Sequence, residues 1–307
     1  MTNADKYLIV VGGPTAVGKT NLAIQLAQHF NTEILSADSR QFYKEISIGT
    51  AKPSIEELAA APHHFIDSHP ITKEFNAGQF EKAALSILEK LFQKHHIAIA
   101  VGGSGLYINA LCQGLDDIPN KDPNIRVHLQ TVYETEGIIA LQKQLEDLDP
   151  HYYAVVDRQN PQRLMRALEV CISSGMPYSS FRKQQLQNRP FKIIKIGLNL
   201  PREQLYAQIN TRVDIMMQAG LLEEAKAMHP YKHLNALQTV GYAELFDYFE
   251  GIHTLEKAVE LIKQHTRNFA KRQLTWFNRD TEMLWFSPFE QEAILQHIQT
   301  QIADEMA

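Results

Sequence analysis

Cysteine is scarce in this sequence, with only Cys112 and Cys171 among 307 residues. The two lie far apart and form neither a C-x-x-C pair nor a disulfide ladder. This spacing argues against a structural zinc site and against a disulfide-stapled extracellular domain. We therefore expect the protein in a reducing compartment, the cytoplasm.

Long apolar runs are also missing. No run approaches the roughly 18 residues that a membrane helix needs, so neither a membrane span nor a membrane partner is expected. Residues 1–11 have a short apolar core without a basic start, and no signal peptide is expected there. With 44% apolar and 21% charged residues, the composition is that of a soluble globular chain. Its length allows one large α/β domain and a smaller one.

An excess of basic residues is absent as well. The formal net charge of −5 argues weakly against wholesale nucleic-acid binding. Binding depends on where the cations lie, however, so the sum does not decide the question.

Residues 1–113 alternate between strand and helix patterns. Apolar runs predict buried strands at Tyr7–Val11, Glu33–Ala37 and Ile97–Val101. Ser54 and Glu57 form a capping box that starts one of the helices. The rhythm predicts an α/β fold, a parallel sheet with helices on both faces.

Strand patterns then vanish over residues 114–190. We interpret this segment as an inserted all-helical domain, with the catalytic core formed by residues 1–113 and 191–307. A further strand is predicted at Ile193–Leu200, and everything beyond Pro201 is expected to be helical. The other predicted helices lie at 125–136, 138–148, 162–174 and 203–228.

The stretch GPTAVGKT, residues 13–20, follows the first strand and has the form of a phosphate loop, G-x-x-x-x-G-K-[ST]. Its glycines let backbone N–H groups turn toward phosphate oxygens, Lys19 adds a charge, and the Thr20 hydroxyl is a candidate Mg²⁺ ligand. The candidate diphosphate-binding residues are Gly13, Pro14, Thr15, Ala16, Val17, Gly18, Lys19 and Thr20.

A nucleotide-hydrolysing enzyme normally has a second acid at a strand end to hold Mg²⁺. The strand at Ile97–Val101 ends in glycines instead, and Asp38 is the one well-placed carboxylate. A lone acid facing a bound diphosphate suits removal of a proton from an acceptor. This weakens a small-molecule kinase hypothesis without excluding it.

Eight sequence blocks occur in one order and cover most of the chain. They resemble the bacterial tRNA dimethylallyltransferases, the tRNA isopentenyltransferases of the IPP transferase family. The blocks are GPTAVGKT (13–20), ADSRQFY (37–43), GTAKP (49–53), HHFID (63–67), VGGSGLY (101–107), NPQRLMRALEV (160–170), GYAEL (241–245) and KRQLTWF (271–277).

This resemblance implies a P-loop NTPase-like fold and transfer of a dimethylallyl group from dimethylallyl diphosphate. The acceptor would be the exocyclic amine of adenosine 37, next to the anticodon in the tRNA anticodon stem-loop, and pyrophosphate would leave. Asp38 would act as the base, Ser104 would stand where the family more often has threonine, and Arg212 would face the diphosphate. Mg²⁺ would be the cofactor, and a monomer is expected.

The reacting adenine would have to be flipped out of the anticodon loop. In the last long predicted helix, Lys263, Arg267 and Lys271 recur every four residues, and a basic stripe beside an aromatic suits single-stranded RNA. The tRNA-binding residues that the resemblance implies are Asp38, Ser39, Arg40, Gln41, Ser104, Arg126, Gln162, Arg163, Leu164, Met165, Arg166, Gly241, Tyr242, Lys271, Arg272, Gln273 and Trp276.

Three alternatives remain open: a P-loop kinase, an adenylate isopentenyltransferase that prenylates free AMP, and a non-enzymatic RNA-binding module. The basic residues of the insertion favour tRNA over AMP as the acceptor, and Asp38 beside a phosphate loop disfavours a mere binding module. The adjacent histidines His63–His64 and His95–His96 lack metal-ligand spacing, so no metal is expected there.

Overall fold

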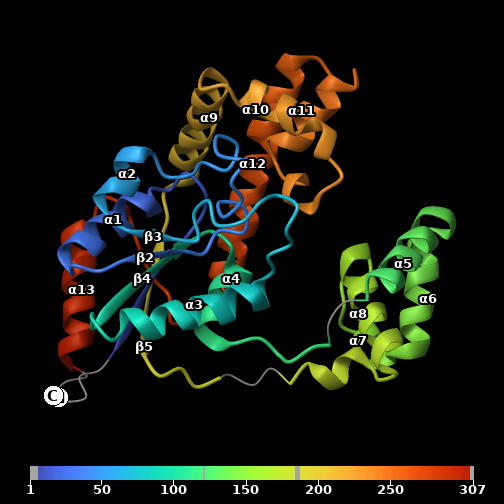
Figure 1. Cartoon of the computed structure of the whole chain (residues 1–307), viewed down its shortest axis with the longest axis horizontal. Coiled ribbons are helices and arrows are strands. Elements are labelled where there is room, and N and C mark those ends of the chain that lie inside the picture. The colour runs from blue at the N-terminus through green and yellow to red at the C-terminus, as the bar shows by residue number, and fades with distance from the viewer. Residues whose placement is uncertain (1–5, 120–121, 184–186, 305–307) are drawn as a thin grey trace. The chain divides into compact units, whose positions relative to one another are not determined.

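The computed structural model describes residues 6–119, 122–183 and 187–304. The chain divides into two compact units, Met1–Gln113 with Asn188–Ala307, and Gly114–Gln187 (Figure 1). The second unit ends at Gln187, three residues before the boundary expected at 190. None of the helices in the described residues has both the length and the hydropathy to cross a bilayer.

The first unit is built on a parallel sheet of six strands within the described ranges, in the order β3-β2-β4-β1-β5-β6. The predicted α/β fold is therefore confirmed. The central strand β1 is buried along its whole length and pairs with β4 and β5. The strands are β1 Tyr7–Gly12, β2 Ile34–Ser36, β3 His63–His64, β4 Ile97–Gly102, β5 Lys192–Leu198 and β6 Leu284–Phe286.

Helices cover both faces of this sheet. Side chains alternate between the two faces along a strand, so neighbouring residues of one strand pack against different helices. Leu8 of β1 packs into a core cluster with α3 and α4, whereas Ile9 packs into a second cluster with α1 and α13 (Figure 1). The helices are α1 Lys19–His29, α2 Ile55–Ala60, α3 Ala77–Leu91, α4 Gly105–Gln113, α9 Arg202–Gln218, α10 Leu221–Met228, α11 Tyr242–Phe249, α12 Leu255–Phe277 and α13 Gln291–Asp304.

Two expectations for the C-terminal part were wrong. The segment beyond Pro201 is not wholly helical, since the short edge strand β6 lies within it. Three residues are too few to show the period of a strand. The single helix expected over 203–228 is divided into α9 and α10, because Gly220 has a φ of +100°, which a continuing helix does not allow.

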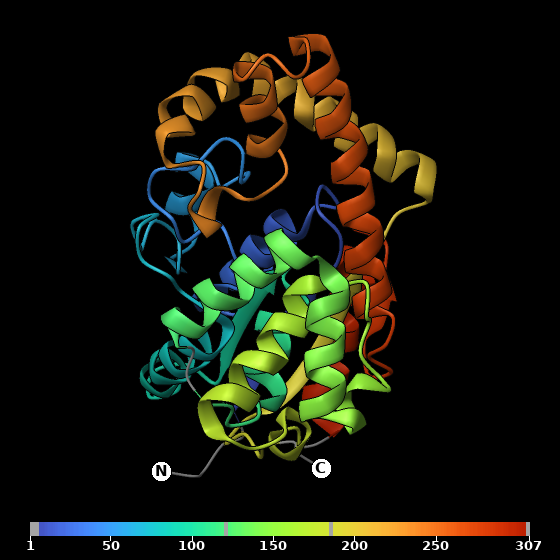
Figure 2. The same cartoon turned by 90° about the vertical axis from the view of Figure 1, so that its right-hand side faces the viewer.

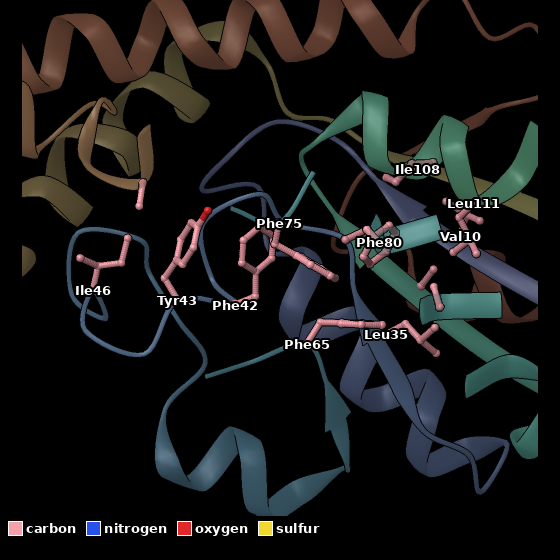
Figure 3. Close-up of a cluster of buried hydrophobic side chains, with 14 of the residues drawn as sticks. Val10, Leu35, Phe42, Tyr43, Ile46, Phe65, Phe75, Phe80, Ile108 and Leu111 are labelled. Atoms are coloured by element: carbon pink, nitrogen blue, oxygen red, sulfur yellow. The ribbon is translucent and has the colours of Figure 1, made fainter. Parts of the chain in front are cut away.

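An aromatic cluster supports the segment that follows β2. Phe42 contacts Phe75 edge-to-face, with ring centroids 5.0 Å apart. Phe42, Phe75 and Phe80 are all buried (Figure 3). Such pairs combine large buried area with a preferred geometry. The cluster therefore holds the chain just after Asp38 in a fixed place.

The second unit is a small helical bundle with its own apolar core (Figure 2). Its core includes the fully buried Leu129, Leu141 and Leu164. Asp122 caps the first helix, with a proline next in line, so this helix begins two residues before the expected 125. The elements are α5 Pro123–Glu136, α6 Ile138–Leu148, α7 Pro150–Tyr153, α8 Pro161–Ser174 and the 3₁₀ helix η1 Tyr178–Phe181.

Candidate functional site

A pocket of about 1270 Å³ lies in the first unit, where the segments that follow β1, β2 and β4 meet. The carboxyl ends of parallel strands are the usual ligand-binding edge of such sheets. Predicted site residues that line this pocket are Thr15, Ala16, Val17, Gly18, Lys19, Thr20, Asp38, Ser39, Arg40, Gln41, Ser104, Arg212, Gly241, Arg272 and Gln273.

The phosphate loop joins β1 to the N-terminus of α1. Gly18, the N-cap residue, has a φ of +100°, and Gly13 has a φ of +144° with the carbonyl of Leu198 close behind it. Only glycine adopts these conformations readily. The loop thereby aims a helix N-terminus into the pocket, an arrangement that favours anions.

Lys19 is the cation of this loop, and its Nζ donates to the carbonyl of Pro14 at 2.5 Å. Burial lowers the pKa of Lys19 to about 7; the carboxylate of Asp38 opposes this shift, and the guanidinium of Arg212 adds to it. An anion bound in the loop would reverse the effect of burial, because it favours the charged ammonium.

Asp38 and Ser104 are brought together at the ends of β2 and β4. Oδ1 of Asp38 accepts hydrogen bonds from the N–H groups of Arg40 (2.9 Å) and Gln41 (3.4 Å), which closes a turn. Oγ of Ser104 accepts from the N–H of Ser39 at 2.9 Å. A carboxylate and a hydroxyl therefore stand beside the phosphate loop in one pocket.

Arg212 lies on α9 and faces the same pocket. Burial lowers the pKa of its guanidinium, while Glu57 opposes the shift. An arginine so placed remains a cation and can bind phosphate oxygens through two parallel hydrogen bonds.

The basic stripe expected on α12 is divided in two. Nζ of Lys263 pairs with Asp214 at 2.5 Å, and a guanidinium nitrogen of Arg267 donates to Asn210 at 2.7 Å, so both residues fasten α12 to α9. Lys271 and Arg272 are exposed. The first two residues of the expected stripe therefore bond α9, and the last two are exposed; the RNA-facing role of the stripe stays a prediction.

Three residues implied as tRNA contacts make contacts within the protein. Tyr242 is fully buried, and its hydroxyl donates to Oε1 of Glu224 at 2.5 Å. The buried amide of Gln273 is hydrogen-bonded at both ends, and the half-buried indole of Trp276 lies against the backbone of Gly105. The side chains of Tyr242 and Gln273 are buried and therefore offer no surface on which a base could stack.

In the second unit, α8 presents its implied contacts unequally. Gln162 and Arg163 are exposed, but the side chains of Leu164 and Met165 are fully buried in the core. The two buried residues would therefore reach RNA through backbone atoms only.

Arg126 and Arg166 are held by a buried acid. Guanidinium nitrogens of Arg126 and Arg166 lie 3.4 and 3.5 Å from the carboxylate of Glu169, whose side chain is 1% exposed. Arg126 also bonds Gln162, and Arg166 donates to the carbonyl of Pro119 at 3.1 Å. Both arginines are thus oriented before any ligand arrives.

Sequence reasoning missed Glu224, a residue of α10. Its carboxylate accepts hydrogen bonds from the N–H groups of Ser47, Ile48 and Gly49 at 2.8, 2.9 and 2.9 Å. These contacts fix the loop that carries the block GTAKP at the pocket. No local signal could have revealed them, because the partners are more than 170 residues apart.

The histidines of the first pair, His63 and His64, contact protein groups. Nδ1 of His63 lies 2.8 Å from the carbonyl of Ala61, and Nε2 of His64 lies 2.7 Å from the carboxylate of Glu33. Across the residues that the structure describes, no group of three His, Cys, Asp or Glu side chains is arranged to hold a metal ion.

The sheet and its loop define a P-loop fold protein, one whose pocket sets a carboxylate and a hydroxyl beside the phosphate loop. A family model described as IPP transferase matches residues 41–280. The chain belongs to the IPP transferase family.

Relatives agree along nearly the full length. The tRNA dimethylallyltransferase of Christiangramia forsetii is 54% identical, over 96% of this chain and 98% of the relative, and that of Cytophaga hutchinsonii is 48% identical, over 99% and 100%. Among solved structures, the full-length tRNA isopentenylpyrophosphate transferase from Bacillus halodurans is 33% identical in sequence. Its crystal structure matches with a TM-score of 0.72 over 98% of each chain. A eukaryotic dimethylallyltransferase acting on tRNA is 28% identical, with a TM-score of 0.72 over 88% of this chain and 69% of that one.

Proposed function

We propose that this protein transfers the dimethylallyl group of dimethylallyl diphosphate to the exocyclic amine of adenosine 37 in tRNA and releases pyrophosphate. The observation that carries the proposal is the placement of Asp38 and Ser104 beside the phosphate loop in one pocket. A kinase would need a second magnesium-binding acid, but β4 ends at Gly102 and is followed by Gly103.

The phosphate loop would hold the diphosphate and then the leaving pyrophosphate. Breaking the allylic C–O bond leaves negative charge on the pyrophosphate. Lys19, Arg212 and the start of α1 line the pocket, where they would face that charge. Donors that are already in place stabilise developing charge without reorganising at the moment of reaction.

Asp38 would take the proton of the attacking amine. An exocyclic adenine amine is a poor nucleophile, since its lone pair is delocalised into the ring, and removal of a proton as the C–N bond forms lowers the barrier. The turn to Arg40 and Gln41 fixes the carboxylate through Oδ1. The hydroxyl proton of Ser104 is free to point toward the substrate, because its oxygen is the acceptor in the bond from Ser39.

The pocket also fits Mg²⁺. Thr20, in the first turn of α1, lines the pocket together with Asp38, and hydroxyl and carboxylate oxygens are the hard donors that this ion prefers. Bound there with the substrate phosphates, the ion would neutralise part of the charge that develops on the leaving group.

The second unit would bind the anticodon stem-loop through phosphate contacts. Arg163 is exposed on α8, and Arg126 and Arg166 are oriented by Glu169. In the first unit, Lys271 is exposed and Arg272 reaches the pocket, where a flipped-out base would enter. We further propose a cytoplasmic monomer, with both buried cysteines unpaired as in a reducing compartment.

The test incubates the purified protein and Mg²⁺ with radiolabelled dimethylallyl diphosphate and offers unmodified tRNA, AMP and ADP in parallel. Label in tRNA alone is expected, and the matched control is the same transcript with guanosine at position 37, which should stay unlabelled. Labelling of AMP would instead support the adenylate isopentenyltransferase. ATP-dependent phosphorylation of a small metabolite, with no use of the prenyl donor, would contradict prenyl transfer.

A further inference from the structure

Gln273 bridges two loops of the pocket that are far apart in sequence. Its Oε1 accepts a hydrogen bond from the backbone N–H of Thr15 at 2.8 Å, and its Nε2 donates to the carbonyl of Gly103 at 2.9 Å. The residue is 6% exposed. One amide on α12 therefore connects the phosphate loop to the residue that precedes Ser104.

The glycines on either side of Ser104 make room for this helix. A Cβ on Gly103 would overlap Nε2 of Gln273, and a Cβ on Gly105 would overlap the indole of Trp276. Gln273 and Trp276 are three residues apart and so lie on one face of α12. The turn that carries Ser104 is thus shaped to receive these two side chains.

We propose that Gln273 is a positioning residue that sets the diphosphate loop against the hydroxyl of Ser104, rather than a contact to RNA. The proposal rests on the proposed function, because it assigns a role within that same pocket. Without the amide, the N–H of Thr15 and the carbonyl of Gly103 would lose their hydrogen-bond partner, and the two loops would no longer share a fixed spacing.

The same helix links this bridge to the expected RNA surface. Arg272, the neighbour of Gln273, is exposed and lines the pocket, and Lys271 is exposed one residue further back. Any shift of α12 that accompanies RNA binding would therefore reach the phosphate loop through the amide of Gln273.

The first experiment compares wild type with Gln273→Met, which keeps the length of the side chain and removes both hydrogen bonds. Thr275→Ala is the control, because Thr275 is an exposed polar residue two positions further along α12, on another face of the helix. The measurements are the dissociation constants of inorganic pyrophosphate and of tRNA, and kcat for prenyl transfer. Circular dichroism identifies a temperature at which every variant is folded.

For Gln273→Met we expect pyrophosphate affinity and kcat to fall by about tenfold or more, the size of a lost buried hydrogen bond, while the tRNA dissociation constant stays within about twofold. Weaker tRNA binding with unchanged pyrophosphate affinity and kcat would overturn the proposal and make Gln273 an RNA contact. Unchanged values throughout would overturn it as well.

A second experiment tests the bridge without relying on Gln273→Met. Gly103→Ala should displace the Gln273 amide and weaken pyrophosphate binding, whereas the same change in a Gln273→Ala background has room for the new methyl group and should cost little more. Additive losses would contradict the proposed bridge. Pyrophosphate titration does not require catalysis, so a wild-type protein that failed to prenylate tRNA would refute the proposed function and leave this test standing.

Discussion

The backbone N–H of Ser39 donates a hydrogen bond to Oγ of Ser104 at 2.9 Å, so the turn after β2 is joined to the turn after β4. Ser104→Ala removes this acceptor, and we expect kcat to fall about tenfold. Ser104→Thr keeps the hydroxyl and restricts its rotamers, so kcat should equal or exceed that of wild type. Steady-state prenylation of tRNA measures both. An alanine variant with full activity would remove Ser104 from the mechanism.

Asp38→Asn is the sharpest test of the proposed base. Asparagine keeps the Oδ1 acceptor for the N–H groups of Arg40 and Gln41, so the turn should persist, whereas alanine would lose it. We expect kcat to fall about 100-fold or more, the usual contribution of a general base, with tRNA affinity unchanged. Single-turnover rates and filter binding provide the two readings. Turnover close to wild type would show that the proton leaves by another route.

Lys19 should take up a proton when diphosphate binds. The pKa of Lys19 is about 7 in the free protein, and a bound anion raises it, so near pH 8 a largely neutral amine becomes charged on binding. Affinity for pyrophosphate should therefore fall as the pH rises above about 7, by up to about tenfold per pH unit.

Calorimetric titrations with pyrophosphate in two buffers of different protonation enthalpy count that proton. Lys19→Arg is the matched control, because arginine is already charged and should bind without the extra uptake. Protonation of pyrophosphate itself contributes equally to both proteins. Equal uptake by the two would show that Lys19 is charged in the free pocket.

Glu224 should stabilise the loop at Ser47–Gly49. In Glu224→Gln an amide group replaces one acceptor oxygen and faces N–H donors, so the free energy of unfolding should fall by about 1–3 kcal/mol. Denaturant melts measure the loss, and Glu223→Gln, an exposed neighbour on α10, should melt like wild type. If the two variants were equally stable, the carboxylate would not be the anchor of this loop.

Arg163 and Arg166 should behave differently although they lie on the same helix. Arg163→Ala should weaken tRNA binding and reduce its salt dependence by about one counterion, with stability unchanged. Arg166→Ala should do the same and also lower stability, because the buried Glu169 would lose one of its two arginine partners.

Binding isotherms at several salt concentrations and thermal melts separate these effects. Lys143→Ala, an exposed cation on α6, is the control for a general change in charge. A salt slope that stayed constant in both arginine variants would remove α8 from the RNA surface.

Much of the fold could be predicted from the sequence, because its signals are local. The apolar runs of β1 and β4 mark buried strands, the capping box at Ser54 marks the start of α2, and α6 occupies the residues expected for it. Strands β3 and β6 escaped notice, since two- and three-residue edge strands have no period of their own.

For the site, sequence patterns indicated which residues gather at the strand ends. They indicated little about the hydrogen-bond partners of each residue. The phosphate loop, Asp38 and Ser104 meet as expected, because each follows a strand of the same parallel sheet. The partners of Gln273, Glu224 and Lys263 could not be predicted, because they depend on how distant helices pack. The helical spacing of the basic residues on α12 could not indicate that Lys263 and Arg267 bond residues of α9.

The position of β1 between β4 and β5 has a consequence for synthesis of the protein. β4 is synthesised before the inserted unit Gly114–Gln187 and β5 after it, so the 89 residues between Gly102 and Lys192 must be made before β1 can pair on both sides. Gln273 emerges later still. A protein truncated before Gln273 would contain the phosphate loop but not the side-chain amide that bonds the N–H of Thr15.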